Sequence, residues 1–494
     1  MTGRGFDVIE RQVVLARSER PSYGSLADPV EAPELATGRA FTVALEALRR
    51  LLAAWGLDRD RASTAAWNPL GAFIRPGSRV VLKPNWVSHH NQSGAGLECL
   101  VTHPSLIEAV LEYVALARPG EVVLGDAPVQ GCDFAALIAA CGVDALVARF
   151  HTRGLNIRLA DFRRSVRAGP ALGAQRREDC RGPEQYVLFD LGTESLLEPL
   201  SADAAKFRVT MYDPRLLLRA HAPGRHQYLI AREVLEADVV INLPKLKTHK
   251  KACITGALKN LVGVNGNKEY LPHHRKGGAA SGGDCYPGRS WRKARAEDLL
   301  DAANRRQPGG VQALLARSAS LALRWARLAG EDADLEGSWY GNDTVWRMCL
   351  DLQRILRYGR ADGTLGAAPQ RSVVTITDAI VAGEGEGPLA STPRPAGFIT
   401  GAVSPAAADW VHARLMGFDP RRIPLVREAF GHYSYALAPF SPSEIRVLDG
   451  AGELEADQVR PPDGRCFRPP SGWSGHCELV GTGDPIPGGQ ALVA

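Results

Sequence analysis

Four short runs rich in β-branched residues set the strongest limit on what this chain can fold into. They read RVVLKPN at 79–85, EVVLGDAP at 121–128, DVVINLPK at 238–245 and SVVTITDA at 372–379. Continuous apolar runs, rather than a strict apolar–polar alternation, are typical of strands that are covered on both faces, as in a parallel sheet.

A helical pattern joins the first two of these runs. In THPSLIEAVLEYVALARPG (102–120), apolar residues recur at helical spacing, Pro104 suits a first turn and Gly120 suits a stop. Strand, helix and strand in this order form a βαβ unit, whose crossover should be right-handed. The sequence therefore predicts an α/β fold with a mostly parallel sheet flanked by helices.

Two segments interrupt the alternation of strands and helices, and they define the expected domains. Charged turns fill 151–225, and a Gly-rich stretch followed by two helical patterns fills 277–370. We expect both to be insertions that form a lid or second lobe. The predicted parts are an N-terminal extension (1–70), a first core part (71–276, with the insertion 151–225), a helical insertion or lid (277–370), a second core part (371–440) and a C-terminal tail (441–494).

Composition excludes several classes of protein. The nine cysteines contain no Cys-x-x-Cys pair, which argues against an iron–sulfur cluster and against a zinc ribbon. The excess of 59 basic over 54 acidic residues is only +5, too small to predict nucleic-acid binding. No uninterrupted apolar run reaches the roughly 18 residues of a membrane span, and the first residues lack a signal-peptide core. We expect a cytoplasmic protein without a membrane span.

Polar side chains follow the predicted strands at the end where parallel strands bind ligands. Lys83 and Asn85 follow the first strand and are predicted to bind substrate, whereas ordinary turn residues are the alternative. The acidic residues at the other strand ends are predicted to bind a divalent metal, or else to form caps and solvated turns. They are Asp126, Asp378, Glu384 and Glu386.

The segment 242–274, NLPKLKTHKKACITGALKNLVGVNGNKEYLPHH, concentrates positive charge. From 243 to 276 there are eight Lys or Arg residues against one Glu. TGALKN reads as a helix entry with Thr255 as N-cap, and free N–H groups at a helix start favour an anion. We expect an anionic ligand to be bound by this segment, through Lys245, Lys247, Thr255, Asn260 and Lys259.

Lys259 and the histidines are the candidate catalytic residues. A lysine within an apolar helix can have a lowered pKa and act as a base or nucleophile. His249, His273 and His274 are candidates for acid–base groups or metal ligands. Because adjacent histidines do not easily share one geometry, we expect at most one of His273 and His274 to act. The alternative is a solvated basic loop, which we expect for Lys250 and Lys251.

Five motifs resemble, in order across roughly 75–420, the domain of unknown function 362 family. They are VVLKPNWV, THPSLIEAV, VVLGDAPVQG, ADVVINLPKLKTHKKACITGALKNLVG and TDAIVAGEGEGP. The resemblance implies an architecture and little chemistry. Members of that family often carry ferredoxin-type cysteine motifs, which this chain lacks. The order His249, Lys259, then His273 or His274 also resembles the cofactor-binding stretch of nickel-pincer lactate racemases. That likeness implies a lysine-tethered cofactor and histidines that bind nickel or move protons.

Three functional hypotheses follow. The first is an enzyme that acts on a small anionic metabolite, a carboxylate or phosphate, with lysines binding charge and a histidine moving a proton. The second is a metal- or cofactor-binding redox or isomerase protein with a lysine-anchored cofactor. The third is a non-catalytic anion-binding or assembly protein. A P-loop nucleotide enzyme is disfavoured because no G-x-x-x-x-G-K-[ST] occurs.

Overall fold

The computed structural model describes residues 8–23, 42–62, 64–168, 176–331 and 335–479. Within these residues the main sheet has eleven strands, and its central part is parallel. Five parallel strands lie side by side in the order β4 (Ile157–Asp161), β3 (Glu121–Asp126), β2 (Arg79–Pro84), β11 (Val239–Leu243) and β15 (Ser372–Glu386). The prediction of an α/β fold with a mostly parallel sheet is confirmed.

Beyond β15 the sheet is mixed, and it includes strands from both ends of the chain. A long hairpin joins β15 to β16 (Ala390–Ala402), and β1 (Gln12–Arg17) pairs antiparallel with β16. The edge is formed by β17 (Arg446–Leu448) and β18 (Glu453–Glu455). Parts of the expected N-terminal extension and C-terminal tail therefore belong to the main sheet.

Side chains of the parallel strands alternate between two hydrophobic cores, one on each face of the sheet. Val80 and Leu82 of β2 face one core, to which α2 (Val43–Ala54), α3 (Pro104–Leu116) and α5 (Val143–Thr152) contribute. Val81 faces the other, with α8 (Ala257–Asn260), α11 (Val345–Tyr358) and α12 (Pro405–Leu415). Burial on both faces explains why the strands read as continuous apolar runs.

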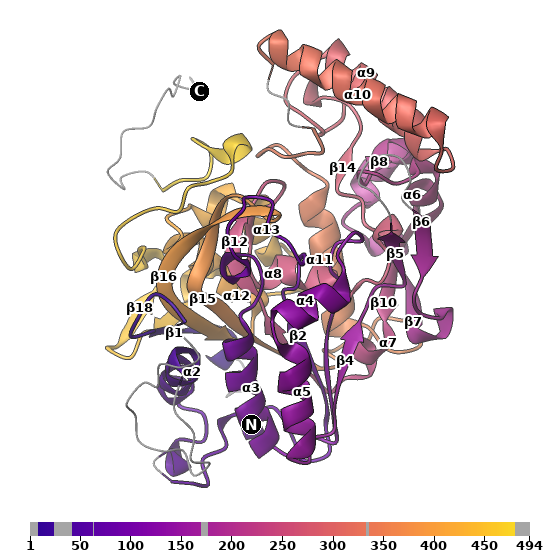
Figure 1. The fold of residues 1–494 in the computed structure, drawn as a ribbon. Helices are drawn as coiled ribbons and strands as arrows, with labels where there is room; N and C mark the ends of the chain where they lie inside the picture. The colour runs from indigo at the N-terminus through magenta and orange to yellow at the C-terminus, as the bar shows by residue number, and fades with distance from the viewer. Residues whose placement is uncertain (1–7, 24–41, 63, 169–175, 332–334, 480–494) are drawn as a thin grey trace.

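The segment 277–370 divides between the core and the periphery. α11 packs into the second core, whereas α9 (Trp291–Asn304) and α10 (Gly310–Leu328) form a helix pair that projects at the top of Figure 1. Among the described residues, no single helix is long and apolar enough to cross a membrane. The bent pair α4 (Phe134–Ala140) and α5 has the necessary length and composition when the two are taken together.

Two short strands carry the lysine-rich segment to the carboxyl end of the sheet. After β11 the chain enters β12 (Lys245–His249), which pairs parallel with the distal half of β15. β12 then pairs antiparallel with β13 (Cys253–Thr255), which leads directly into α8. This arrangement brings the motif TGALKN against the ends of β2 and β3.

Candidate functional site

A cavity of about 150 Å³ lies at the carboxyl ends of β2 and β3. Segments far apart in the sequence line it, as expected for a site outside the ends of parallel strands. Of the residues predicted from sequence, those that line the cavity are Lys83, Asn85, Asp126, His249, Thr255, Lys259, Asn260 and His273.

A buried ion pair forms the floor of this cavity. Lys83 Nζ lies 2.6 Å from Asp126 Oδ1, and both side chains are almost inaccessible to solvent. Asp126 also accepts the N–H groups of Trp86 and Ala127, and Lys83 donates to Asn260 Oδ1 at 3.0 Å. These hydrogen bonds satisfy both charges within the protein, so the pair fixes the ends of β2 and β3 to the lysine-rich segment.

The close approach of the turn after α8 (Leu261–Val264) to the ion pair requires a residue without a side chain. A Cβ on Gly263 would lie 2.0 Å from Asp126 Oδ1 and 2.7 Å from Lys83 Nζ. A second glycine, Gly256, would place a Cβ 2.0 Å from Asp409 Oδ1. The glycines of TGALKNLVG therefore allow this segment to pack directly on two buried carboxylates.

Asp409, and not Thr255, caps the segment. The carboxylate of Asp409 in α12 accepts the N–H groups of Ala257 and Leu258 at 2.7 and 2.9 Å. The predicted N-cap hydrogen bond from Thr255 is absent from the described structure, and Gly256 occupies the N-cap position. A protein carboxylate thus already fills the anion position that the sequence suggested for a ligand.

Two further lysines of the cavity differ from Lys83 because no carboxylate of the described chain pairs with them. Among the described residues, Lys259 Nζ has no hydrogen-bond or ion-pair partner, and the half-buried Lys268 reaches only the Ala127 carbonyl at 3.4 Å. Burial lowers the pKa of Lys259, and burial together with the neighbouring Lys259 lowers the pKa of Lys268 to about 8. The hydroxyl of Thr255 is also buried without a partner in the described chain. The cavity therefore has more donors than acceptors.

The two histidines of the cavity have opposite tautomers, which their backbone contacts determine. His249 Nδ1 accepts the N–H groups of Lys251 and Ala252, so its proton is on Nε2. His273 Nδ1 lies 2.7 Å from the Leu271 carbonyl and must donate to it, which leaves Nε2 as an acceptor. Burial is the main cause that lowers the pKa of both rings well below the ordinary value. The second cause is the positive charge of Lys259 for His249 and of Lys251 for His273. Both rings are therefore neutral at pH 7, one as a donor and one as an acceptor.

The other lysines of the segment do not line the cavity. Lys245 Nζ lies 2.7 Å from Asp378 Oδ2 and hydrogen-bonds Tyr23, whose hydroxyl also bonds Asp378. Lys247 donates to Asn85 Oδ1 and to the carbonyl of Leu100. The structure thus gives both predicted substrate-binding lysines protein partners.

The four acidic residues predicted to bind a metal do not come together. Asp126 and Asp378 are in separate buried ion pairs with lysines. Glu384 accepts the N–H of Arg468, and Glu386 accepts that of Ser471 and pairs with Lys250 at 3.1 Å. Because Glu384 and Glu386 are bound to the C-terminal segment, this set offers no common coordination site. His274 is also absent from the cavity that His273 lines.

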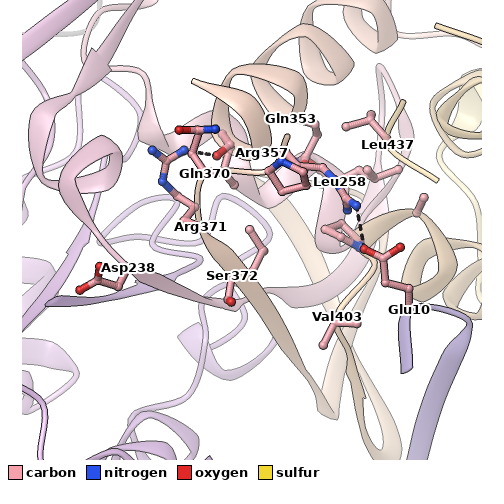
Figure 2. Close-up of a pocket in the computed structure, with 15 residues that line it drawn as sticks. Glu10, Asp238, Leu258, Gln353, Arg357, Gln370, Arg371, Ser372, Val403 and Leu437 are labelled. Atoms are coloured by element: carbon pink, nitrogen blue, oxygen red, sulfur yellow. Dashed lines mark hydrogen bonds and ion pairs between the residues drawn. The ribbon is translucent and has the colours of Figure 1, made fainter. Parts of the chain in front are cut away.

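A larger cavity, of about 330 Å³, lies at the opposite end of the strands (Figure 2). Its polar side chains are already used: Arg357 pairs with Glu10 at 2.7 Å, and Arg371 donates to the carbonyls of Leu356, Leu235 and Gly359. Gln353 donates to the Leu258 carbonyl. Its polar groups are therefore structural, and the smaller cavity remains the candidate site.

Sequence reasoning missed Lys268 and Asp409. Lys268 belongs to the lysine-rich segment, but its spacing alone gave no reason to single it out. Asp409 follows its two donors, Ala257 and Leu258, by 152 and 151 residues along the chain. No local sequence pattern connects it to them.

Comparisons with known proteins identify a family and list two similar proteins. The family model described as "Domain of unknown function (DUF362)" matches residues 80–176 and 178–414. A "Thylakoid-associated protein sll1697" of Synechocystis sp. is 23% identical over 357 residues, which cover 72% of this chain and 68% of that protein. A crystal structure of a Thermotoga maritima protein matches with 10% identity and a TM-score of 0.25 over 65% of this chain. That match spans about half (49%) of the Thermotoga chain.

Proposed function

This chain belongs to the family of domain of unknown function DUF362, and we propose that it is an enzyme that binds a small anionic metabolite. The ligand class is a carboxylate or phosphate, bound in the cavity between Lys259 and Lys268. His273 accepts a proton from the ligand, and His249 donates a hydrogen bond to it.

The observation that carries this proposal is the surplus of donors in the cavity. Lys259 Nζ, the Thr255 hydroxyl and His249 Nε2–H have no acceptor among the described residues. The carboxylate that lines the cavity with them, Asp126, is satisfied by Lys83 and two backbone N–H groups. The Thr255 hydroxyl is buried without a partner, and Lys259 is half-buried without a counter-charge, so an anion that pairs with them gains free energy.

The paired tautomers support proton transfer in addition to binding. A neutral imidazole whose Nδ1–H is held by a carbonyl presents Nε2 as a proton acceptor, the arrangement found in general bases. Because the pKa of His273 is lowered by burial, this base stays unprotonated at neutral pH. The ammonium groups of Lys259 and Lys268 would stabilise negative charge that develops on the ligand when the proton leaves.

A second candidate function is covalent anchoring of a carbonyl-containing cofactor by Lys259. The observation that favours it is the lowered pKa of a lysine amine that has no partner in the described part of the chain. Intact-mass measurement of the purified protein separates the two functions, because an adduct that is lost in Lys259→Met supports anchoring.

The test of the proposed function compares Lys259→Met with Lys250→Met. Lys250 lies in the same segment but does not line the cavity, and it pairs with Glu386, so it serves as the matched control. A panel of small carboxylates and phosphates is screened by thermal stabilisation. We expect Lys259→Met to bind the stabilising anion at least about tenfold more weakly, which corresponds to about 1.4 kcal/mol. Equal stabilisation of Lys259→Met and the wild type would exclude this site.

Proton transfer is tested separately with His273→Gln. With the stabilising ligand in D₂O, NMR detects exchange of a ligand hydrogen for deuterium. We expect His273→Gln to retain anion binding and to lose the exchange. Exchange that persists unchanged in His273→Gln leaves the anion site intact but removes the assigned base.

A further inference from the structure

A second group of reactive side chains lies apart from the cavity. His274 of β14 (His274–Arg275), Cys285 and Glu297 of α9 present ligand atoms that all lie within 4.8 Å of one another. Their side chains are buried, with exposed fractions of 5%, 1% and 6%. They line a space of about 40 Å³, which is sufficient for one ion or one water molecule.

The imidazole of His274 is the least explained member of this group. Its Nδ1 is buried without a hydrogen-bond partner among the described residues. A buried polar group with no partner calls for a specific explanation, and a bound ion is one.

The other two residues are already oriented by the backbone. The Glu336 N–H donates to Cys285 Sγ at 3.1 Å. The Gly277 N–H donates to both oxygens of Glu297, at 3.0 and 3.1 Å. Contacts of this kind orient and tune metal ligands. Arg208 lines the same space, but Asp301 pairs with its guanidinium at 2.9 Å and neutralises it.

We propose that His274, Cys285 and Glu297 bind a divalent cation of the zinc class. Imidazole nitrogen, thiolate sulfur and carboxylate oxygen are the three ligand types that zinc accepts, and a water molecule completes a tetrahedron. The bound ion would connect β14 to α9. Through Cys285 it would also connect both to the backbone at Glu336. Its role is structural and does not depend on the proposed activity.

The test measures metal in the full chain purified without added metal. We expect close to one equivalent of zinc by elemental analysis, and a sulfur-to-cobalt charge-transfer band when cobalt replaces zinc. Cys285→Ser should lose the band and weaken metal binding by more than the roughly 10–100-fold that outer-shell changes cost. Cys141→Ser, at a half-buried cysteine on the opposite side of the sheet, is the control.

His274→Gln provides a second variant in case Cys285→Ser does not fold. This change should also weaken metal binding, although it leaves the Cys285 thiol in place. A wild-type protein that binds no stoichiometric zinc or cobalt, or a Cys285→Ser protein that binds cobalt as tightly as the wild type, would overturn the assignment.

An independent observation concerns the outer face of α10. Five large apolar side chains are exposed there: Val311 (61%), Leu314 (63%), Leu321 (61%), Trp325 (51%) and Leu328 (88%). Their separations of three, seven, four and three residues place them on one face of the helix. The pair α9 and α10 projects from the body of the molecule (Figure 1), so this face is available to a flat partner.

All charged side chains of α10 are positive. Its charged residues are Arg317, Arg324 and Arg327, and it contains no Asp or Glu. At one end of the face, the rings of Trp291 and Trp325 meet at 4.8 Å, and the Arg292 guanidinium lies over both of them. Exposed apolar residues with arginines and tryptophan at their edge are typical of helices that lie in a membrane interface.

We infer that α10 binds peripherally to an anionic lipid surface. In flotation with vesicles that contain phosphatidylglycerol, the wild type should float, and it should float less with phosphatidylcholine alone. Leu314→Glu with Leu321→Glu should abolish flotation, whereas Leu188→Glu, an exposed leucine of β7 (Tyr186–Asp190), should not. Flotation that survives the double change would overturn this inference. So would a dimer that the double change dissociates without any vesicle binding.

Discussion

At the scale of single residues, the lysines of this protein differ in whether the protein itself neutralises them. Lys83 and Lys245 are fully buried and paired with aspartates at 2.6 and 2.7 Å. Lys259 and Lys268 have no carboxylate partner in the described chain, although both line the same cavity as Lys83. The sequence does not distinguish paired from unpaired lysines, but only the unpaired lysines are free to bind an external anion.

Gly263 is the residue on which the geometry of the buried ion pair depends. Gly263→Ala would force a Cβ within 2.0 Å of Asp126 Oδ1, which would separate Asp126 from Lys83. Breaking a buried pair leaves uncompensated charge, so we expect a loss of unfolding free energy of about 3 kcal/mol. Urea denaturation measures it. Gly131→Ala, where an added Cβ meets no atom within 4 Å, should change stability little. Equal stability of the two variants would show that the loop moves away at no cost.

At the scale of elements, β12 and α8 show how secondary structure distributes the lysine-rich segment. Because β12 is a strand, Lys245, Lys247 and His249 lie on one face at intervals of two residues. Each of them reaches a different environment: the Asp378 pair, the Leu100 carbonyl and the cavity. α8 is only a single turn, and its N–H groups depend on Asp409 of α12. The position of Lys259 is thus determined by an element that follows it by about 150 residues along the chain.

At the scale of the whole molecule, the sheet with a core on each face buries several neutral histidines. Burial is the main cause that lowers the pKa of His103 to about 4 and of His221 to about 3, and it lowers those of His249, His273 and His274 well below 6.5. In the unfolded chain these rings titrate near 6.5. Below that pH the unfolded state binds more protons than the folded state, so acid favours unfolding.

We therefore expect stability to be fully present above pH 6.5 and to fall as the pH decreases towards 5. His103 should account for on the order of 2 kcal/mol of this loss. His103→Asn keeps an N-cap for α3 and removes the titrating ring, so its unfolding free energy should depend less on pH in this range. The exposed His151→Asn is the control. Urea denaturation at pH 7, 6 and 5 makes the comparison. Parallel pH profiles for His103→Asn and wild type would contradict this account.

The sequence by itself determined the class of fold and much of the composition of the candidate site. Continuous apolar runs imply strands that are buried on both faces, and chain direction in a parallel sheet places Lys83 and Asp126 at the same edge. The family followed from the same motifs, and the match over residues 80–176 and 178–414 confirms it. These features are local, or follow from the parallel topology alone.

Only the tertiary structure decided which charged groups are paired. Nothing local indicates that Asp378 meets Lys245, that Glu384 and Glu386 bind the C-terminal segment, or that Asp409 caps α8. The same holds for His273 and His274, which are neighbours in sequence and lie at two different sites. The physical reason is that the free energy of a buried charge depends on its partners in space, and those partners lie up to hundreds of residues away in sequence.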